Sequence, residues 1–175
     1  MVLPGLLLAT ALAAAPAAAT AGPPSSDDSP FEPAKSAPPC QGEARAACLL
    51  DSGFAGPERF LAAHPRSTHA AEAVAAANDA LAAAARALRE ARAAAPVKGR
   101  DAEAVERTLA SYERLAHGLP RPLAAAAFDA MGDLAHAAGD VLHARRFSQL
   151  GAMAPDAAVA ARSKARLREI AVGGP

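Results

Sequence analysis

The chain has 175 residues, of which 52% are apolar, mostly alanine, with no tryptophan and one tyrosine. This length suits one modest domain. Alanine is the best helix former, whereas the residues that favour strands are scarce. Eighteen Lys and Arg balance eighteen Asp and Glu, so the chain lacks the net positive charge typical of nucleic-acid binding. We therefore predict an all-α protein that does not bind nucleic acid.

The charges alternate along the chain in blocks. Residues 66–100 and 140–175 each carry six basic against three acidic side chains, and residues 25–65 and 101–139 show the reverse. Such blocks are typical of solvated helix faces. They would also suit a surface polarised toward a charged partner.

The N-terminus has the composition of an export signal. Residues 1–21 carry no charge, and their apolar run ends in Ala19-Thr20-Ala21, which fits the A-x-A cleavage pattern. We predict a signal peptide over residues 1–21 and a periplasmic or secreted mature chain. No basic residue precedes the run, so an uncleaved anchor and an unrelated leader remain alternatives. The run is rich in alanine and contains two prolines, so no stable membrane span is expected after cleavage.

Residues 22–39 are rich in proline and acidic side chains, which predicts a disordered tether. Cys40 and Cys48 follow it and are the only two cysteines. An even count in an exported chain favours a disulfide, and Gln41-Gly42 would supply the necessary turn. Two unpaired thiols are the alternative. The spacing matches neither a redox motif nor a zinc motif.

Helix-breaking residues divide residues 40–171 into consecutive helices, and residues 172–175 are expected to be a disordered tail. The helices are expected over residues 44–50, 57–63, 68–94, 101–119, 123–138, 141–154 and 156–170. The expected N-caps are Ser67, Asp101 and Asp140, and Gly139 is expected to end a helix in the left-handed conformation. Because the corners are short, we predict antiparallel hairpins that stack as a short solenoid, each helix packing mainly on its sequence neighbours.

Two segments resemble tetratricopeptide-type repeats. Within residues 125–155, the family's spacing is matched at Phe128, Gly132, Gly139, Asp140 and Ala144, with Pro155 one position early. Upstream, Phe60, Pro65 and Ser67 match a sequence motif of periplasmic proteins of this family, of the TolA-binding and outer-membrane-assembly types. The matched segments cover roughly a quarter to a third of the chain. The resemblance implies a groove for a peptide or protein and no chemistry. An unrelated alanine-rich bundle whose composition mimics the pattern is the alternative.

No residue is predicted to be catalytic or to bind a cofactor, because no acyl-transfer, nucleotide-binding or zinc-hydrolase motif occurs. Five acidic and histidine side chains recur at helical steps and would suit a metal: Asp129, Asp133, His136, Asp140 and His143. Since Gly139-Asp140 is expected to separate them, we predict a solvated face and no metal. Arg86, Arg89 and Arg92 are likewise expected to be solvated.

These observations predict an exported helical module for a protein or peptide partner, acting in the cell envelope without catalysis or cofactor. The alternative is a structural envelope protein that self-associates through the long alanine-rich helix. Gly151 is expected inside a helix, where alanine would be the better residue by about 0.5–1 kcal/mol unless packing forbids it.

Overall fold

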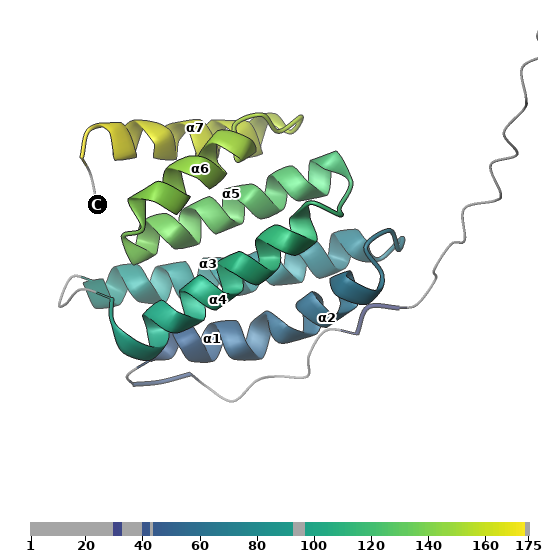
Figure 1. The fold of residues 1–175 in the computed structure, drawn as a ribbon, viewed down its shortest axis with the longest axis horizontal. Coiled ribbons are helices and arrows are strands. Elements are labelled where there is room, and N and C mark those ends of the chain that lie inside the picture. The colour runs from purple at the N-terminus through teal and green to yellow at the C-terminus, as the bar shows by residue number, and fades with distance from the viewer. Residues whose placement is uncertain (1–29, 33–39, 43, 93–96, 174–175) are drawn as a thin grey trace, which may run out of the picture.

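The computed structural model describes residues 30–32, 40–42, 44–92 and 97–173, and over these residues it confirms the predicted all-α fold (Figure 1). Its helices are α1 (Arg45–Gly53), α2 (Ala55–Ala63), α3 (Ala70–Arg92), α4 (Gly99–Ala116), α5 (Arg121–Ala138), α6 (Val141–Gly151) and α7 (Ala157–Ala171). None of these helices is both long and apolar enough to cross a membrane. The predicted signal peptide, and most of the predicted tether, lie outside the described residues.

Helices α1 to α5 form a closed bundle. α1, which leads into α2 through Phe54, packs against both α3 and α4. α5 packs against the same two helices from the other side (Figure 1). The backbones of α3 and α4 do not touch, so these two consecutive helices occupy opposite corners of the bundle. The expectation that each helix packs mainly on its sequence neighbours therefore does not hold for this pair.

Tyr112 of α4 fills the centre of the bundle. α3 turns small side chains such as Ala73 and Ala77 toward the core, where both are fully buried. The Tyr112 hydroxyl donates a hydrogen bond to Asn78 Oδ1 of α3 at 2.9 Å, and its ring lies edge-on to Phe54 with the centroids 5.2 Å apart. Burial raises the pKa of this hydroxyl far above its ordinary value. One large side chain thus spans the gap between two helices whose backbones stand apart.

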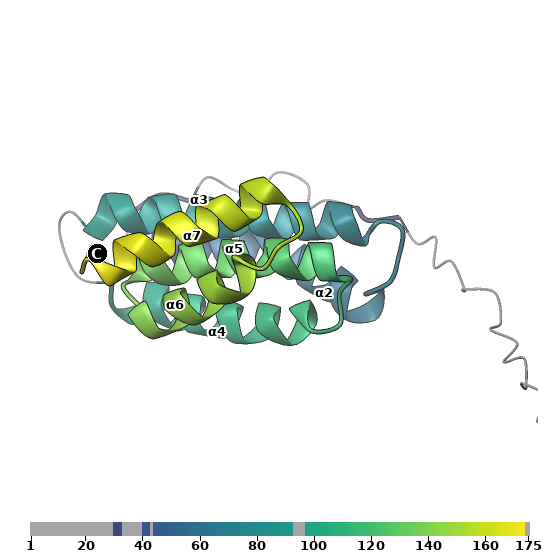
Figure 2. The same cartoon turned by 90° about the horizontal axis from the view of Figure 1, so that it is seen from above.

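Helices α6 and α7 extend the bundle beyond α5. α6 packs along α5, and α7 packs against both of them. Seen from above, α4 and α6 lie on one side of α5, and α3 and α7 lie on the other (Figure 2). The corner between α5 and α6 forms as predicted, because Gly139 is left-handed at φ 82° and Asp140 accepts a hydrogen bond from the backbone N–H of His143 at 3.1 Å.

The role predicted for Asp101 is wrong. α4 begins at Gly99, and Asp101 Oδ1 accepts a hydrogen bond at 2.7 Å from the backbone N–H of Ala47, in the first turn of α1. The carboxylate therefore satisfies an unpaired donor of a different helix. A cap supplied from another helix leaves no local pattern in the sequence.

The N-terminal segment is attached to the helices at two places. Cys40 and Cys48 form a disulfide with their Cα atoms 5.7 Å apart, which matches the predicted pairing. Phe31, in the predicted tether, lies edge-on to Phe60 of α2 with the ring centroids 5.3 Å apart. Phe31 therefore packs on the helical body, within a segment for which the composition predicted a disordered tether.

Candidate functional site

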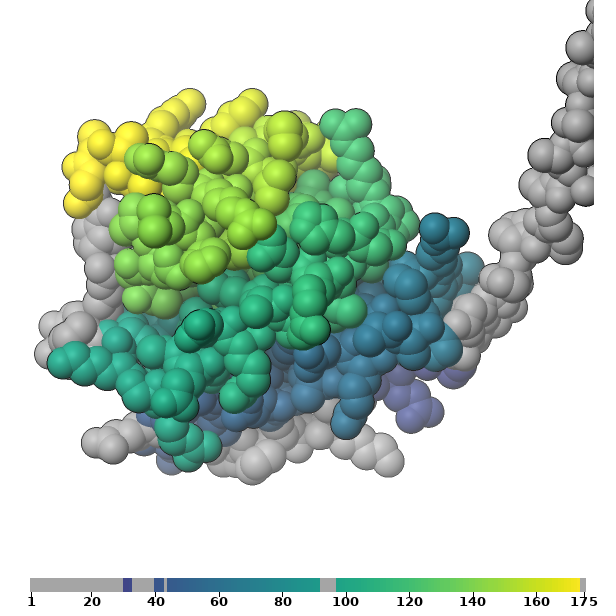
Figure 3. Space-filling model, viewed as in Figure 1, coloured from purple at the N-terminus to yellow at the C-terminus, as the bar shows by residue number. Residues whose placement is uncertain are grey.

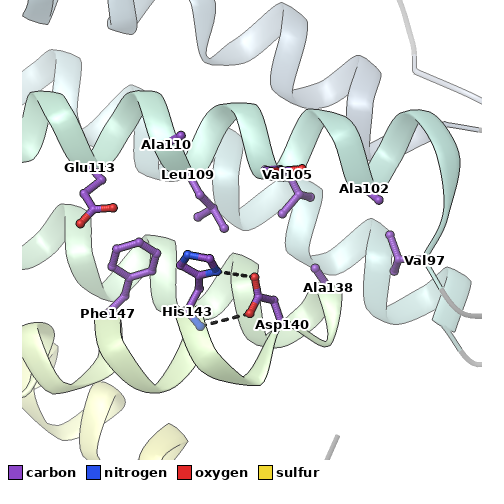
Figure 4. Close-up of a pocket in the computed structure, with 11 residues that line it drawn as sticks. Val97, Ala102, Val105, Leu109, Ala110, Glu113, Ala138, Asp140, His143 and Phe147 are labelled. Atoms are coloured by element: carbon purple, nitrogen blue, oxygen red, sulfur yellow. Dashed lines mark hydrogen bonds and ion pairs between the residues drawn. The ribbon is translucent and has the colours of Figure 1, made fainter.

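A groove of about 380 Å³ lies between α4 and α6 (Figure 4). It exists because both helices pack on α5 while their backbones do not touch each other. Its α4 wall carries Ala102, Glu106, Ala110 and Glu113, its α6 wall carries Asp140 and His143, and Val97 lies at one end. This volume lies within the range of small-ligand and side-chain sites.

The floor of the groove is apolar. Val105 and Leu109 of α4 and Phe147 of α6 line it, and all three are buried, with 4%, 4% and 0% of their surface exposed. Phe147 stacks on the His143 ring with the centroids 5.8 Å apart. The apolar side chains of the groove that solvent reaches are Val97, Ala102, Ala110 and Ala138, and an entering apolar side chain would meet these first.

Two of the three carboxylates on the groove walls form ion pairs or hydrogen bonds within the protein, and the third, Glu106, forms no ion pair among the described residues. Glu113 forms an ion pair with Arg146, so this pair joins α4 to α6. Asp140 lies 2.5 Å from His143 Nδ1 through one oxygen and caps the α6 backbone through the other. Glu106 is exposed and has no ion-pair partner among the described residues. No Lys or Arg side chain lines the groove.

α6 also carries two exposed apolar side chains outside the groove. Val141 and Leu142, in its first turn, are 48% and 81% exposed. Neither residue lines the groove. α4 and α6 lie on the same face of the molecule, which Figure 3 shows as the green surface toward the viewer. The groove is the candidate docking surface.

A second polar cluster holds α7 against α5 and α6. Asp129 of α5 is buried, and its carboxylate accepts hydrogen bonds from Ser163 Oγ at 2.7 Å and Arg162 Nε at 2.9 Å. Arg166 is also buried and donates to the Asp129 carboxylate at 3.3 Å and to Ser148 Oγ at 3.2 Å. The prediction that Asp129 lies on a solvated face is therefore wrong, because α7 covers it.

The same cluster extends to α3. Asp133 accepts from Arg166 of α7 at 3.2 Å and from Arg89 of α3 at 2.6 Å, so Arg89 is not simply solvated as predicted. His136, also predicted to be solvated, is buried. Burial lowers the pKa of His136, an effect that Glu169 opposes and Arg166 reinforces. The cluster is a structural contact among helices, and its charges are directed at one another.

Two glycines make room for this cluster. A Cβ on Gly132 would lie 2.8 Å from Ser148 Oγ and 2.9 Å from Arg166 Nη1. A Cβ on Gly151 would overlap Ser163 Oγ and lie 3.3 Å from the backbone of Asp129. The condition attached to alanine at position 151 is therefore not met, because packing against α7 and α5 forbids the methyl group there.

The residues that resemble the repeat family lie at three separate places. Phe128, Gly132 and Ala144 are buried where α5 meets α6, with Gly139 and Asp140 at the corner between these helices, and Phe128 stacks on Phe147 with the centroids 6.2 Å apart. Phe60 lies in α2, and Pro65 and Ser67 lie at the corner that follows it, where the Ser67 hydroxyl accepts from the His69 N–H at 3.1 Å. Pro155 lies in the α6–α7 loop. Of all these residues, only Asp140 lines the groove.

The α4 wall of the groove was not predicted from the sequence. The signal was present in the acidic block 101–139, which contains Glu106 and Glu113, but nothing showed that α6 would lie opposite them. The five acidic and histidine positions divide between α5 and α6, as predicted. Within the described part of the chain, no group of three His, Cys, Asp or Glu side chains is placed to hold a metal ion.

Comparison of this chain with family models, with curated proteins and with solved structures found no match. The tetratricopeptide-type resemblance therefore stays a prediction.

Proposed function

We propose that this chain is an exported helical module that binds a protein or peptide partner in the cell envelope through the groove between α4 and α6, and that it performs no catalysis. The observation that carries the proposal is a groove between two helices in which the apolar side chains of Val97, Ala102, Ala110 and Ala138 remain open to solvent. A partner that fills it removes apolar surface from water, which contributes about 25 cal/mol per Å². Docking of a segment between two helices is a common recognition mode.

The other polar features of the molecule give less support to a binding role. The cluster around Asp129 and Arg166 is buried, and its side chains form hydrogen bonds with one another rather than facing a partner. Export is supported by the signal-like residues 1–21 and by the Cys40–Cys48 disulfide, since disulfides persist mainly in oxidising compartments.

Self-association is the second candidate function, and the exposure of Leu142 favours it. The long helix α3 is a poor surface for this purpose, because Ala77, Leu81 and Ala84 are fully buried inside the bundle. A self-associating form would therefore use α6 rather than α3.

Site-specific photo-crosslinking in the envelope of the source cell tests the proposal. A photoreactive phenylalanine analogue replaces Ala110, which is exposed and lines the groove, or Ala161, which is exposed on α7 and serves as the matched control. We expect a discrete adduct from position 110 and none from position 161. Equal adducts from both positions, or none from position 110, would refute docking at the groove.

A further inference from the structure

We infer that the occupant of the α4–α6 groove is a cationic amphipathic segment, with a large apolar side chain on the floor and a lysine or arginine beside Glu106. This inference rests on the proposed function and adds the chemistry of the partner. It combines the apolar floor with the charge of the walls, which carry the carboxylates of Glu106, Glu113 and Asp140 and no Lys or Arg side chain.

Glu106 is the carboxylate that remains available. Glu113 is paired with Arg146, and Asp140 is engaged by its own helix and by His143. Glu106 is exposed at the groove wall and has no ion-pair partner among the described residues. A cation placed beside it would gain attraction without breaking an existing contact. An anionic segment would be repelled by the Glu106 carboxylate, which no ion pair neutralises among the described residues.

The position of Arg146 determines which end of the groove can accept the positive side chain of the occupant. Its guanidinium pairs with Glu113 and lies over the Phe147 ring, 5.6 Å from the centroid. This end of the groove therefore already holds a positive charge and would repel another. The attraction for a cation is thus confined to the part of the groove near Glu106, which lies one turn from Ala102 on α4. Figure 4 shows Val97 and Ala102 at the end of the groove away from Glu113.

The spacing of the two recognition features on α4 predicts a spacing in the partner. Glu106 and the exposed groove residue Ala110 are four positions apart on one helix, so their side chains are neighbours on its surface, about 5–6 Å apart at Cβ. The same separation in a helical partner places the leucine and the lysine one turn apart. A helical peptide with that pattern is the probe that fits best.

Fluorescence anisotropy with the purified, oxidised full chain tests the inference. The probe is a labelled helical peptide with one leucine and one lysine a turn apart, and the comparison peptide has glutamate in place of the lysine. We expect the lysine peptide to bind more tightly and to lose affinity as salt increases. Glu106→Gln should weaken the lysine peptide about threefold. Glu103→Gln, one turn earlier on α4, exposed and outside the groove, should not change it.

Equal affinity for the two peptides would overturn the inference, as would equal losses from Glu106→Gln and Glu103→Gln. Absence of binding by the lysine peptide at any soluble concentration would also overturn it. If crosslinking at Ala110 persists in these cases, docking at the groove survives and only the chemistry of the partner is wrong. A crosslinked adduct that proves to be a second copy of the chain likewise overturns a separate cationic partner.

Discussion

Replacing Gly151 by alanine should destabilise the protein, although the helix alone would favour the change. Gly151 is the last residue of α6, and alanine there gains about 0.5–1 kcal/mol from helix propensity. The new methyl group, however, overlaps Ser163 Oγ of α7 and presses on the backbone of Asp129 in α5. Overpacking of this kind costs about 1–3 kcal/mol. Displacement of Ser163 also disturbs its buried hydrogen bond to Asp129, which adds about 1 kcal/mol or more. The net expectation is a loss of about 1–3 kcal/mol.

Urea denaturation followed by circular dichroism measures this loss, and a double-mutant cycle identifies its cause. Ser163→Ala removes the oxygen that the new methyl group overlaps, so the two changes together should cost less than the sum of the separate costs. We expect a coupling of about 1 kcal/mol or more. A Gly151→Ala midpoint at or above the wild-type value would refute the close approach of α7 to α6. Strict additivity would show that Ser163 is not the obstacle.

Three further predictions concern other parts of the molecule. Replacing both Cys40 and Cys48 by serine should lower the free energy of unfolding by about 2–3 kcal/mol in urea melts, because the bridge no longer restricts the unfolded chain. Gly139→Val should cost about 1–2 kcal/mol in the same assay, because Gly139 is left-handed, and Gly139→Asn should cost less. Burial lowers the pKa of His136 in the native state, so below its ordinary value of 6.5 the unfolded chain takes up a proton that the native protein resists. Stability should therefore fall as the pH drops from 7 through 6.5 and below, and His136→Phe should reduce this slope in urea melts at a series of pH values.

Each of these predictions has a result that contradicts it. A reductant that leaves the wild-type midpoint unchanged would remove any stabilising role from the disulfide, and the double serine variant should itself be insensitive to reductant. Equal stability of Gly139→Val and wild type would mean that α5 and α6 are one continuous helix. An identical pH slope in wild type and His136→Phe would mean that this histidine titrates normally in the folded protein.

The sequence predicted those features of the fold that depend on local patterns. The left-handed Gly139 and the cap at Asp140 are local chemistry, and both appear in the structure. The placement of α3 and α4 at opposite corners depends instead on Tyr112 reaching Asn78, a contact between side chains that lie 34 positions apart in the chain. The same limit explains Asp101, whose carboxylate serves α1 rather than its own helix.

The site was less predictable than the fold. The groove exists because α4 and α6 both pack on α5 without backbone contact between them, and no periodicity in the sequence encodes that separation. Asp129 and His136 have the spacing of a solvated face and are buried, since α7 supplies Ser163 and Arg166 to cover them. Whether such polar residues are buried depends on the side chains that a different helix packs against them. The sequence of their own helix therefore could not predict it.

The diagonal placement of α3 and α4 has a consequence for the order in which the chain assembles. α1 contacts both of these helices, and α5 closes the ring from the other side. The core around Tyr112 therefore cannot close until the chain is present from Arg45 to Ala138, which makes this bundle one cooperative unit. α6 and α7 pack their backbones on α5 alone among the helices of this bundle. The wall that α6 gives to the groove can therefore form only where α5 is already in place.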